Sequence, residues 1–184
     1  MKVLLVLGLA FGAIVSFATH AATAKDRIES AAVNQEANGL ELSLAADKRR
    51  YKRGDEIRLQ AMLLNTGRYI FVYGTLEWGH YASFTLYVRD ARGKEVESDF
   101  IHDALTHPLE PTDRSPFVKL LPYHFLGKYY YSTIRKLNMQ KPGRYAIFVE
   151  YHSPISTTEV ELKPFFGKEN GTIKSNVVYV EVLR

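Results

Sequence analysis

The segment 137–151, LNMQKPGRYAIFVEY, constrains the fold more than any other part of the chain. Its Lys141-Pro142-Gly143 is typical of a tight turn, because proline presets φ and glycine accepts a positive φ. From Arg144 onward apolar residues alternate with others at period two, as in a β-strand. One face of that strand carries Tyr145, Ile147, Val149 and Tyr151. A tyrosine that follows such a turn at the start of a strand indicates a tyrosine corner, whose hydroxyl bonds upstream backbone, here expected at 137–139.

Tyrosine corners lie between the fifth and sixth strands of immunoglobulin-like sandwiches. The remaining sequence agrees, since it contains 12 tyrosines, 10 phenylalanines and short period-two segments between turns. We therefore predict an all-β, immunoglobulin- or fibronectin III-like antiparallel sandwich of two sheets and about eight or nine strands, with two long loops. The expected strands are residues 40–45, 56–64, 69–73, 82–90, 94–97, 117–121, 128–137, 144–152 and 174–183. The long loops are 98–115 and 153–171, the second with a short strand at 158–162 as an alternative.

The first 24 residues have the pattern of a secretory signal peptide. Met1-Lys2 is a short positive start, residues 3–17 form an uncharged, mostly apolar run, and Ala22-Thr23-Ala24 is a small-residue cleavage site. The apolar run is shorter than the roughly 20 residues of a membrane span, although a retained anchor is an alternative. We expect export to the periplasm or the extracellular space, no integral membrane span after cleavage, a flexible segment 25–39 and one sandwich domain over 40–184.

Composition excludes several other classes of protein. The chain has no cysteine, which excludes a disulfide framework and a lipoprotein anchor. Its formal net charge of +4 falls to +3 when Lys2 is removed with the signal peptide, too little to indicate nucleic-acid binding.

Five cations surround one tyrosine between the first two expected strands. They are Lys48, Arg49, Arg50, Lys52 and Arg53. Such a cluster could contact anionic lipid or an acidic polymer. We favour a solvated hairpin that turns at Gly54, in which Tyr51 fills the end of the sandwich while the charges face water.

Several strand and turn motifs resemble a known family. They are the segment YKRGDEI at 51–57, Asn65-Thr66-Gly67, the segment FTLYVRDARGKEV at 84–96, and Pro142-Gly143-Arg144-Tyr145. Together they are similar to the bacterial family of the Bacillus intracellular proteinase inhibitor, over about residues 40–151. The resemblance implies an immunoglobulin-like sandwich and offers proteinase inhibition as one expected activity. No matched motif carries an inhibitory residue, and this chain departs from the family in its signal peptide and two long loops.

Neither catalysis nor a bound metal is indicated. The sequence has no Gly-x-Ser-x-Gly motif, and its carboxylates are scattered, so we predict no enzyme activity. His102, Asp103, His107 and Glu110 share one loop and could bind zinc or copper, but their spacing is loose. We predict no metal site and no cofactor. The other histidines of the domain are separated in the sequence: His80, His124 and His152.

Aromatic residues are the strongest indication of a binding function, since tyrosine and tryptophan give large, rigid contact area with a polar tip. The predicted binding residues are Trp78, His80, Tyr81, Phe100, Ile101, His102, His107, Phe165 and Phe166. Another aromatic run precedes the corner strand and comprises Tyr123, His124, Phe125 and Tyr129 to Tyr131. Because Tyr129 and Tyr131 share one face of a strand and Tyr130 takes the other, part of this run must be core.

The sequence therefore predicts a non-enzymatic, exported domain that binds another protein through loops at its end. We expect both long loops to be ordered and to lie beside the Trp78 connection. The alternatives are a proteinase inhibitor and a carbohydrate- or metal-binding periplasmic protein. Coplanar exposed aromatic rings would favour sugar, converging histidines would favour metal, and a rigid protruding loop would favour inhibition.

Overall fold

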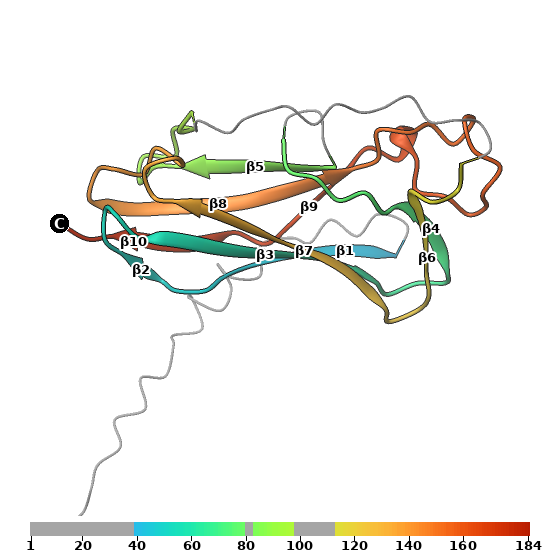
Figure 1. Ribbon diagram of the computed structural model, residues 1–184, viewed down its shortest axis with the longest axis horizontal. Helices are drawn as coiled ribbons and strands as arrows, with labels where there is room; N and C mark the ends of the chain where they lie inside the picture. Colours follow the sequence, from blue (N-terminus) through green and yellow to red (C-terminus); the bar gives the residue numbers. More distant parts are fainter. Residues whose placement is uncertain (1–38, 80–82, 98–112) are drawn as a thin grey trace, which may run out of the picture.

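The computed structural model describes residues 39–79, 83–97 and 113–184, which form a sandwich of two β-sheets (Figure 1). Sheet A has the order β1 (Leu40–Ala46), β3 (Glu56–Asn65), β7 (Phe125–Thr133). Sheet B has the order β2 (Arg50–Tyr51), β10 (Val178–Val182), β8 (Gly143–His152), β5 (Phe84–Arg89), with β9 (Thr172–Lys174) also paired to β8. A separate pair joins β4 (Ile70–Tyr73) to β6 (Phe117–Leu120). A 3₁₀ turn, η1, spans Lys168–Asn170.

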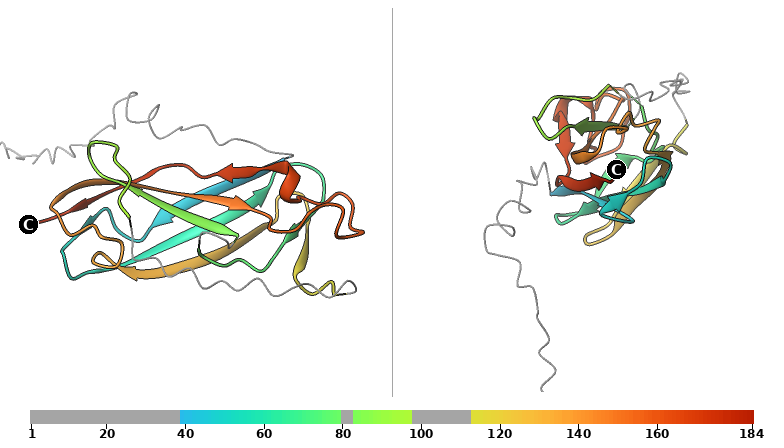
Figure 2. Two further views of the ribbon diagram at one scale, coloured as in Figure 1. Left: turned by 90° about the horizontal axis from the view of Figure 1, so that it is seen from above. Right: turned by 90° about the vertical axis from the view of Figure 1, so that its left-hand side faces the viewer.

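These strands pair antiparallel, except that β2 runs parallel to β10. The chain crosses from sheet A to sheet B between β1 and β2 and returns to sheet A at β3. The predicted all-β, immunoglobulin-like sandwich is therefore confirmed. Figure 2 shows it from above and from one end.

The inner faces of the two sheets make the core, as the period-two patterns predicted. The buried inward residues of sheet A are Leu40, Leu42, Leu44, Ile57, Leu59, Ala61 and Leu63. Those of sheet B are Phe84, Leu86, Val88, Tyr145, Ile147, Val149, Tyr151, Val180 and Val182. Burying these alternating side chains between two sheets supplies the main stabilising term in a chain without disulfides.

Several expected strand boundaries are wrong. The strand expected at 128–137 begins at Phe125 and ends at Thr133, after which residues 134–138 form a turn. Residues 94–97 form only one bridge, between Glu95 and Arg89, and 158–162 is not a strand. The last strand is divided into β9 and β10 because residues 175–177 leave the ladder. At this break the Ser175 hydroxyl accepts the N–H of Val149 at 3.0 Å, so the side chain replaces a backbone acceptor.

The tyrosine corner is present, with a different partner from the expected one. The Tyr145 hydroxyl donates to the Lys141 carbonyl at 2.8 Å, whereas 137–139 was expected. Leu137 and Met139 are fully buried, because the turn after β7 packs into the core. The carbonyl within reach is therefore the one directly before the Pro142-Gly143 turn, where Gly143 has a φ of +149°.

Single side chains close the two open sides of the sandwich. On one side, the Asn176 amide accepts the N–H of Leu44 at 2.8 Å and donates to the Leu44 carbonyl at 3.0 Å, which joins β1 to the β9–β10 break. On the other side, the Trp78 ring packs between Phe84 of β5 and Tyr130 of β7. The outer edges of the two sheets are thus linked at both sides of the core.

Candidate functional site

Three of the predicted binding residues lie in the described part of the chain: Trp78, Phe165 and Phe166. The other six lie outside the described residues: His80, Tyr81, Phe100, Ile101, His102 and His107. Of the loop expected at 98–115, only residues 113–115 are described, so its predicted position beside Trp78 stays a prediction.

Trp78 is a packing residue that is half-buried. Its ring centroid lies 5.0 Å from that of Phe84 and 5.2 Å from that of Tyr130. Its Nε1–H donates to the carbonyl of Tyr129 at 3.3 Å. The indole is thus held between the sheets and offers only part of its surface to a ligand.

Phe165 and Phe166 lie inside the protein, at the end formed by β4 and β6. The second long loop is fastened to β4 here, because the Phe71 N–H donates to the Pro164 carbonyl and the Phe166 N–H donates to the Phe71 carbonyl. The ring of Phe165 lies edge-on to Phe117 at 5.4 Å. In Figure 1 this loop lies at the end of the sandwich opposite the C-terminus.

The same loop is ordered by one carboxylate. Glu169 accepts a hydrogen bond from the Ser156 hydroxyl and another from the Thr157 N–H at 3.0 Å. These hydrogen bonds hold the pKa of Glu169 at about 2, well below the usual range for a glutamate. The loop is therefore braced across its neck although the carboxylate itself is exposed to water.

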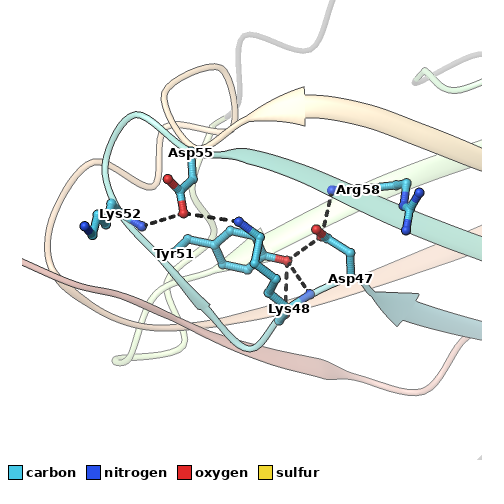
Figure 3. Close-up of polar contacts among 6 residues, drawn as sticks. All are labelled: Asp47, Lys48, Tyr51, Lys52, Asp55 and Arg58. Atoms are coloured by element: carbon cyan, nitrogen blue, oxygen red, sulfur yellow. Dashed lines mark hydrogen bonds and ion pairs between the residues drawn. The ribbon is translucent and has the colours of Figure 1, made fainter.

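The basic segment 48–53 connects β1 to β3 through β2, and the side chains of three of its five cations bond within the protein. Figure 3 shows the Lys48 ammonium and the Lys52 N–H on Asp55. Lys48 pairs with Asp55 at 3.3 Å and Arg50 pairs with Glu181 at 3.1 Å. Arg53 Nε donates to the carbonyl of Gln140 at 2.7 Å. The charges face water as expected, but the segment is not a simple hairpin, because β2 pairs parallel with β10 of sheet B.

Tyr51 of β2 fills the end of the sandwich, as expected, and is fully buried. Its hydroxyl donates to Asp47 at 2.8 Å (Figure 3), and burial raises its pKa. Partial burial opposes ionisation of Asp47, but bonds from the Arg58 N–H and the Tyr51 hydroxyl hold its pKa below the usual range. Asp47 therefore ties β1, β2 and β3 together as an ionised acceptor.

The described residues contain no group of three or more histidine, cysteine or acidic side chains placed to hold a metal ion. His124 lies in the turn before β7, whereas His152 ends β8 in the other sheet. No helix in the described ranges is long and apolar enough to cross a membrane.

The structure exposes a different set of aromatic residues. Seven large hydrophobic side chains are exposed among the described residues, and five of them belong to the segment 121–131. They are Leu121, Tyr123, Phe125, Tyr129 and Tyr131, with exposed fractions of 42%, 78%, 63%, 47% and 68%. Such a concentration is unusual, because exposed apolar residues are normally scattered singly over a monomer.

Phe125, Tyr129 and Tyr131 point to the outer side of sheet A. They alternate along β7 with Leu126 and Tyr130, which pack on the core. On the neighbouring β3 the register places Leu64 opposite Phe125 and Met62 opposite Gly127. We call Met62, Leu64, Phe125, Tyr129 and Tyr131 the β7 aromatic face.

The two exposed tyrosines of this face are tilted, not coplanar. Their ring centroids are 6.0 Å apart and their planes make an angle of 42°. The guanidinium of Arg58 lies over the Tyr129 ring at 5.6 Å. Beyond Tyr131 the face continues into an open groove of about 510 Å³, lined by Asp47, Glu56, Ile57, Arg58, Tyr131, Ser132, Thr133 and Lys136.

On the outer side of sheet B one aromatic ring is buried and one is exposed beneath a cation. Phe148 is buried on that side, stacked on Tyr87 at 4.9 Å and capped by the ammonium of Lys174 at 4.0 Å. Tyr179 is exposed but lies under the guanidinium of Arg144, 4.0 Å from the ring centroid. Cations thus screen the aromatic surface of sheet B.

The sequence contained part of this site. The aromatic run before the corner strand was recognised, as was the opposite orientation of Tyr130, which is partly buried against Trp78. The run was not included among the predicted binding residues. Period two shows that Tyr129 and Tyr131 share a face, but not that no strand or loop covers that face.

Comparisons with known proteins show no family for this chain. No family model matches the chain, and no curated protein matches it. Among solved structures, a CARDB domain from Pyrococcus furiosus, in complex with di-metal ions, is 13% identical, with a TM-score of 0.39 over 83% of this chain and 94% of that one. The sporulation control protein Spo0M from Bacillus subtilis is 10% identical, with a TM-score of 0.41 over 79% of this chain and 50% of that one. Both are distant likenesses to immunoglobulin-like β-sandwich domains.

Proposed function

We propose that this chain is an exported, non-enzymatic binding domain that contacts another protein through the β7 aromatic face. The observation that carries the proposal is the exposure of Phe125, Tyr129 and Tyr131 on one face of β7, directly after a turn that also exposes Leu121 and Tyr123. Aromatic side chains of this kind dominate protein interfaces, because they bury much area at little cost in conformational entropy.

The chemistry of the face favours a protein over a sugar. The 42° angle between the Tyr129 and Tyr131 rings does not make the flat platform on which a pyranose ring stacks. The neighbouring Met62 and Leu64 are apolar and partly buried, so this part of the face is apolar, while the exposed Glu56 and Arg58 form a charged margin. An apolar centre with a polar rim is the usual organisation of a protein–protein interface.

Site-specific photocrosslinking tests the proposal. Tyr129, Tyr131 and, as a matched control, Tyr179 are each replaced by p-benzoylphenylalanine in the protein expressed in its native cells. Tyr179 is a suitable control because it is similarly exposed, at 41%, on the outer side of sheet B. We expect covalent adducts with a different protein from positions 129 and 131 and none from 179. Equal adducts at all three positions, or none, would contradict the proposal.

Export is tested separately by N-terminal sequencing of the protein from the cell envelope or the medium. We expect the mature chain to begin at Lys25, since Ala22-Thr23-Ala24 matches a signal-peptidase site. Recovery of a chain that begins at Met1 would contradict this part of the proposal.

Proteinase inhibition is a second candidate, favoured by the brace at Glu169. Inhibitory loops must hold an extended segment rigidly, and the Ser156 and Thr157 bonds to Glu169 restrain the neck of the second long loop. A panel of serine and cysteine proteinases is assayed with the parent protein and with Glu169→Gln. Inhibition by the parent that weakens in the variant would support this candidate, and absence of inhibition at micromolar protein would exclude it for the panel.

A further inference from the structure

The edge of β7 carries backbone groups that point away from sheet A. The carbonyl of His124 accepts the N–H of Asn65, and the N–H of Ile134 donates to the carbonyl of Asp55. Because hydrogen-bonded positions alternate along an antiparallel pair, the even-numbered residues of β7 bond to β3. The odd-numbered residues, from Phe125 to Thr133, direct their N–H and C=O groups outward.

Part of this edge is already occupied. The Tyr129 carbonyl accepts the indole N–H of Trp78, and the Thr133 carbonyl accepts the N–H of Leu137. Before the strand, the N–H of Tyr123 donates to the carbonyl of Asn65 at 2.7 Å. In the described ranges, Phe125 and Gly127 are thus the residues of the first half of β7 whose outward N–H and C=O groups have no partner strand.

These two positions are complementary in size. Phe125 carries a ring that is 63% exposed, and Gly127 carries no side chain. A Cβ at 127 would lie 3.0 Å from the carbonyl oxygen of Ala61 and 3.3 Å from Met62 Cγ, so a larger residue would require these neighbours to shift. The outer face therefore has a gap at Gly127. The ring of Phe125, two residues away on the same face, has a size that could fill such a gap on another strand.

We propose that two copies of this chain pair along the β7 edge, antiparallel, about a two-fold axis at Leu126. In this register Phe125 of each copy lies opposite Gly127 of the other, so each ring covers the other copy's gap. Covering an edge glycine with a cross-strand aromatic ring is a known way to stabilise a β-sheet pair. A two-fold arrangement is also the commonest symmetry of soluble homo-oligomers.

The pairing satisfies the free backbone groups on both copies. The N–H and C=O groups of Phe125 exchange two hydrogen bonds with those of Gly127 on the second copy, and symmetry doubles this pair. Lys128, the only charged residue of β7, lies opposite His124 of the second copy, so no like charges face each other. The two three-stranded sheets then become one continuous sheet with both β7 aromatic faces on the same side.

This inference shares Phe125 with the proposed binding face, but it rests on the backbone groups at the edge of β7, which binding of a different protein at Tyr129 and Tyr131 does not need. Sedimentation velocity of the purified mature protein at increasing concentration gives the first test. We expect a dimer peak that disappears in Phe125→Asp, since the charge would be buried over the second copy's Gly127. Tyr179→Asp, an exposed substitution on sheet B, should leave the dimer unchanged. A parent protein that remains monomeric throughout would overturn the proposal.

The register is tested by single cysteines, which report without interference because the chain has none. In the proposed pairing Leu126 lies directly opposite its own copy at a Cα separation of about 4.5 Å, within disulfide range. Under mild oxidation we expect Leu126→Cys to form a covalent dimer and Lys128→Cys, four residues out of register with its copy, to remain monomeric. Equal cross-linking of both variants, or of neither, would overturn the proposal. Adducts with a different protein at Tyr131 would persist in either case, so failure of the dimer and failure of the binding face are distinguishable.

Discussion

The amide of Asn176 should contribute measurably to stability, because it is a polar link between β1 and the β9–β10 break of the second sheet. In β1 the odd-numbered residues bond to β3, as the bond from Asp47 N–H to the Arg58 carbonyl shows. Leu44 therefore directs its N–H and C=O to the free edge, where Asn176 pairs with both, at 2.8 and 3.0 Å.

Asn176→Ala removes both hydrogen bonds. Each bond contributes about 0.5–1.5 kcal/mol, and a buried group left without a partner costs about 1–3 kcal/mol. The Asn176 side chain is only partly buried, so water can reach one of the two groups. We expect a loss of about 2–3 kcal/mol in the free energy of unfolding, equivalent to a fall of about 4–12 °C in Tm.

Asn176→Asp adds a pH dependence with a defined sign. An ionised carboxylate can accept from the Leu44 N–H, but its second oxygen then faces the Leu44 carbonyl. The protonated acid can donate to that carbonyl, so folding should raise the pKa of the new carboxyl above its unfolded value of about 3.9. Its stabilising contribution is fully present below that value and is lost as pH rises through the folded pKa.

Urea unfolding at several pH values measures both effects. The stability difference between parent and Asn176→Asp should narrow as pH falls from about 7 to about 4. Gln140→Glu, the same amide-to-acid change at an exposed position, is the control and should show no such narrowing. If Asn176→Ala lost less than about 0.5 kcal/mol, or the Asp variant showed a constant difference, the linking role of this amide would be refuted.

Three further substitutions test other parts of the fold. Tyr145→Phe should lose about 1–2 kcal/mol in denaturant unfolding, because the bond to the Lys141 carbonyl is removed while the ring still packs; unchanged stability would contradict the corner. Val149→Ala should lose about 2–3 kcal/mol in the same assay through a cavity between the sheets. Because the pKa of Glu169 is about 2, its hydrogen bonds to Ser156 and Thr157 stabilise the loop fully above about pH 4.5. This stabilisation is lost as pH falls toward 2. Glu169→Gln should abolish that acid-induced change in hydrogen exchange of the loop amides; an unchanged pH profile would show that Glu169 does not brace it.

Much of the fold followed from local patterns. The alternation in 144–152 identified an inner face whose four residues are all buried, and the Pro142-Gly143 turn placed the tyrosine corner at Tyr145. Period two is imposed by the geometry of a single strand, so it can be read without knowing the neighbours. The corner's acceptor could not be read this way, because it depends on how the turn after β7 packs.

Only the tertiary structure decided which aromatic residues are free to bind. Phe165 and Phe166 looked like loop anchors for a partner, but they are buried at the end formed by β4 and β6. Tyr129, Tyr130 and Tyr131 are the same residue type in one run. Tyr129 and Tyr131 are exposed on the outer side of sheet A, whereas Tyr130 packs on the core. The sequence by itself determined which side chains share a strand face, because alternation is local. The tertiary structure alone decided which face stays uncovered, because that depends on strands and loops far away in the chain.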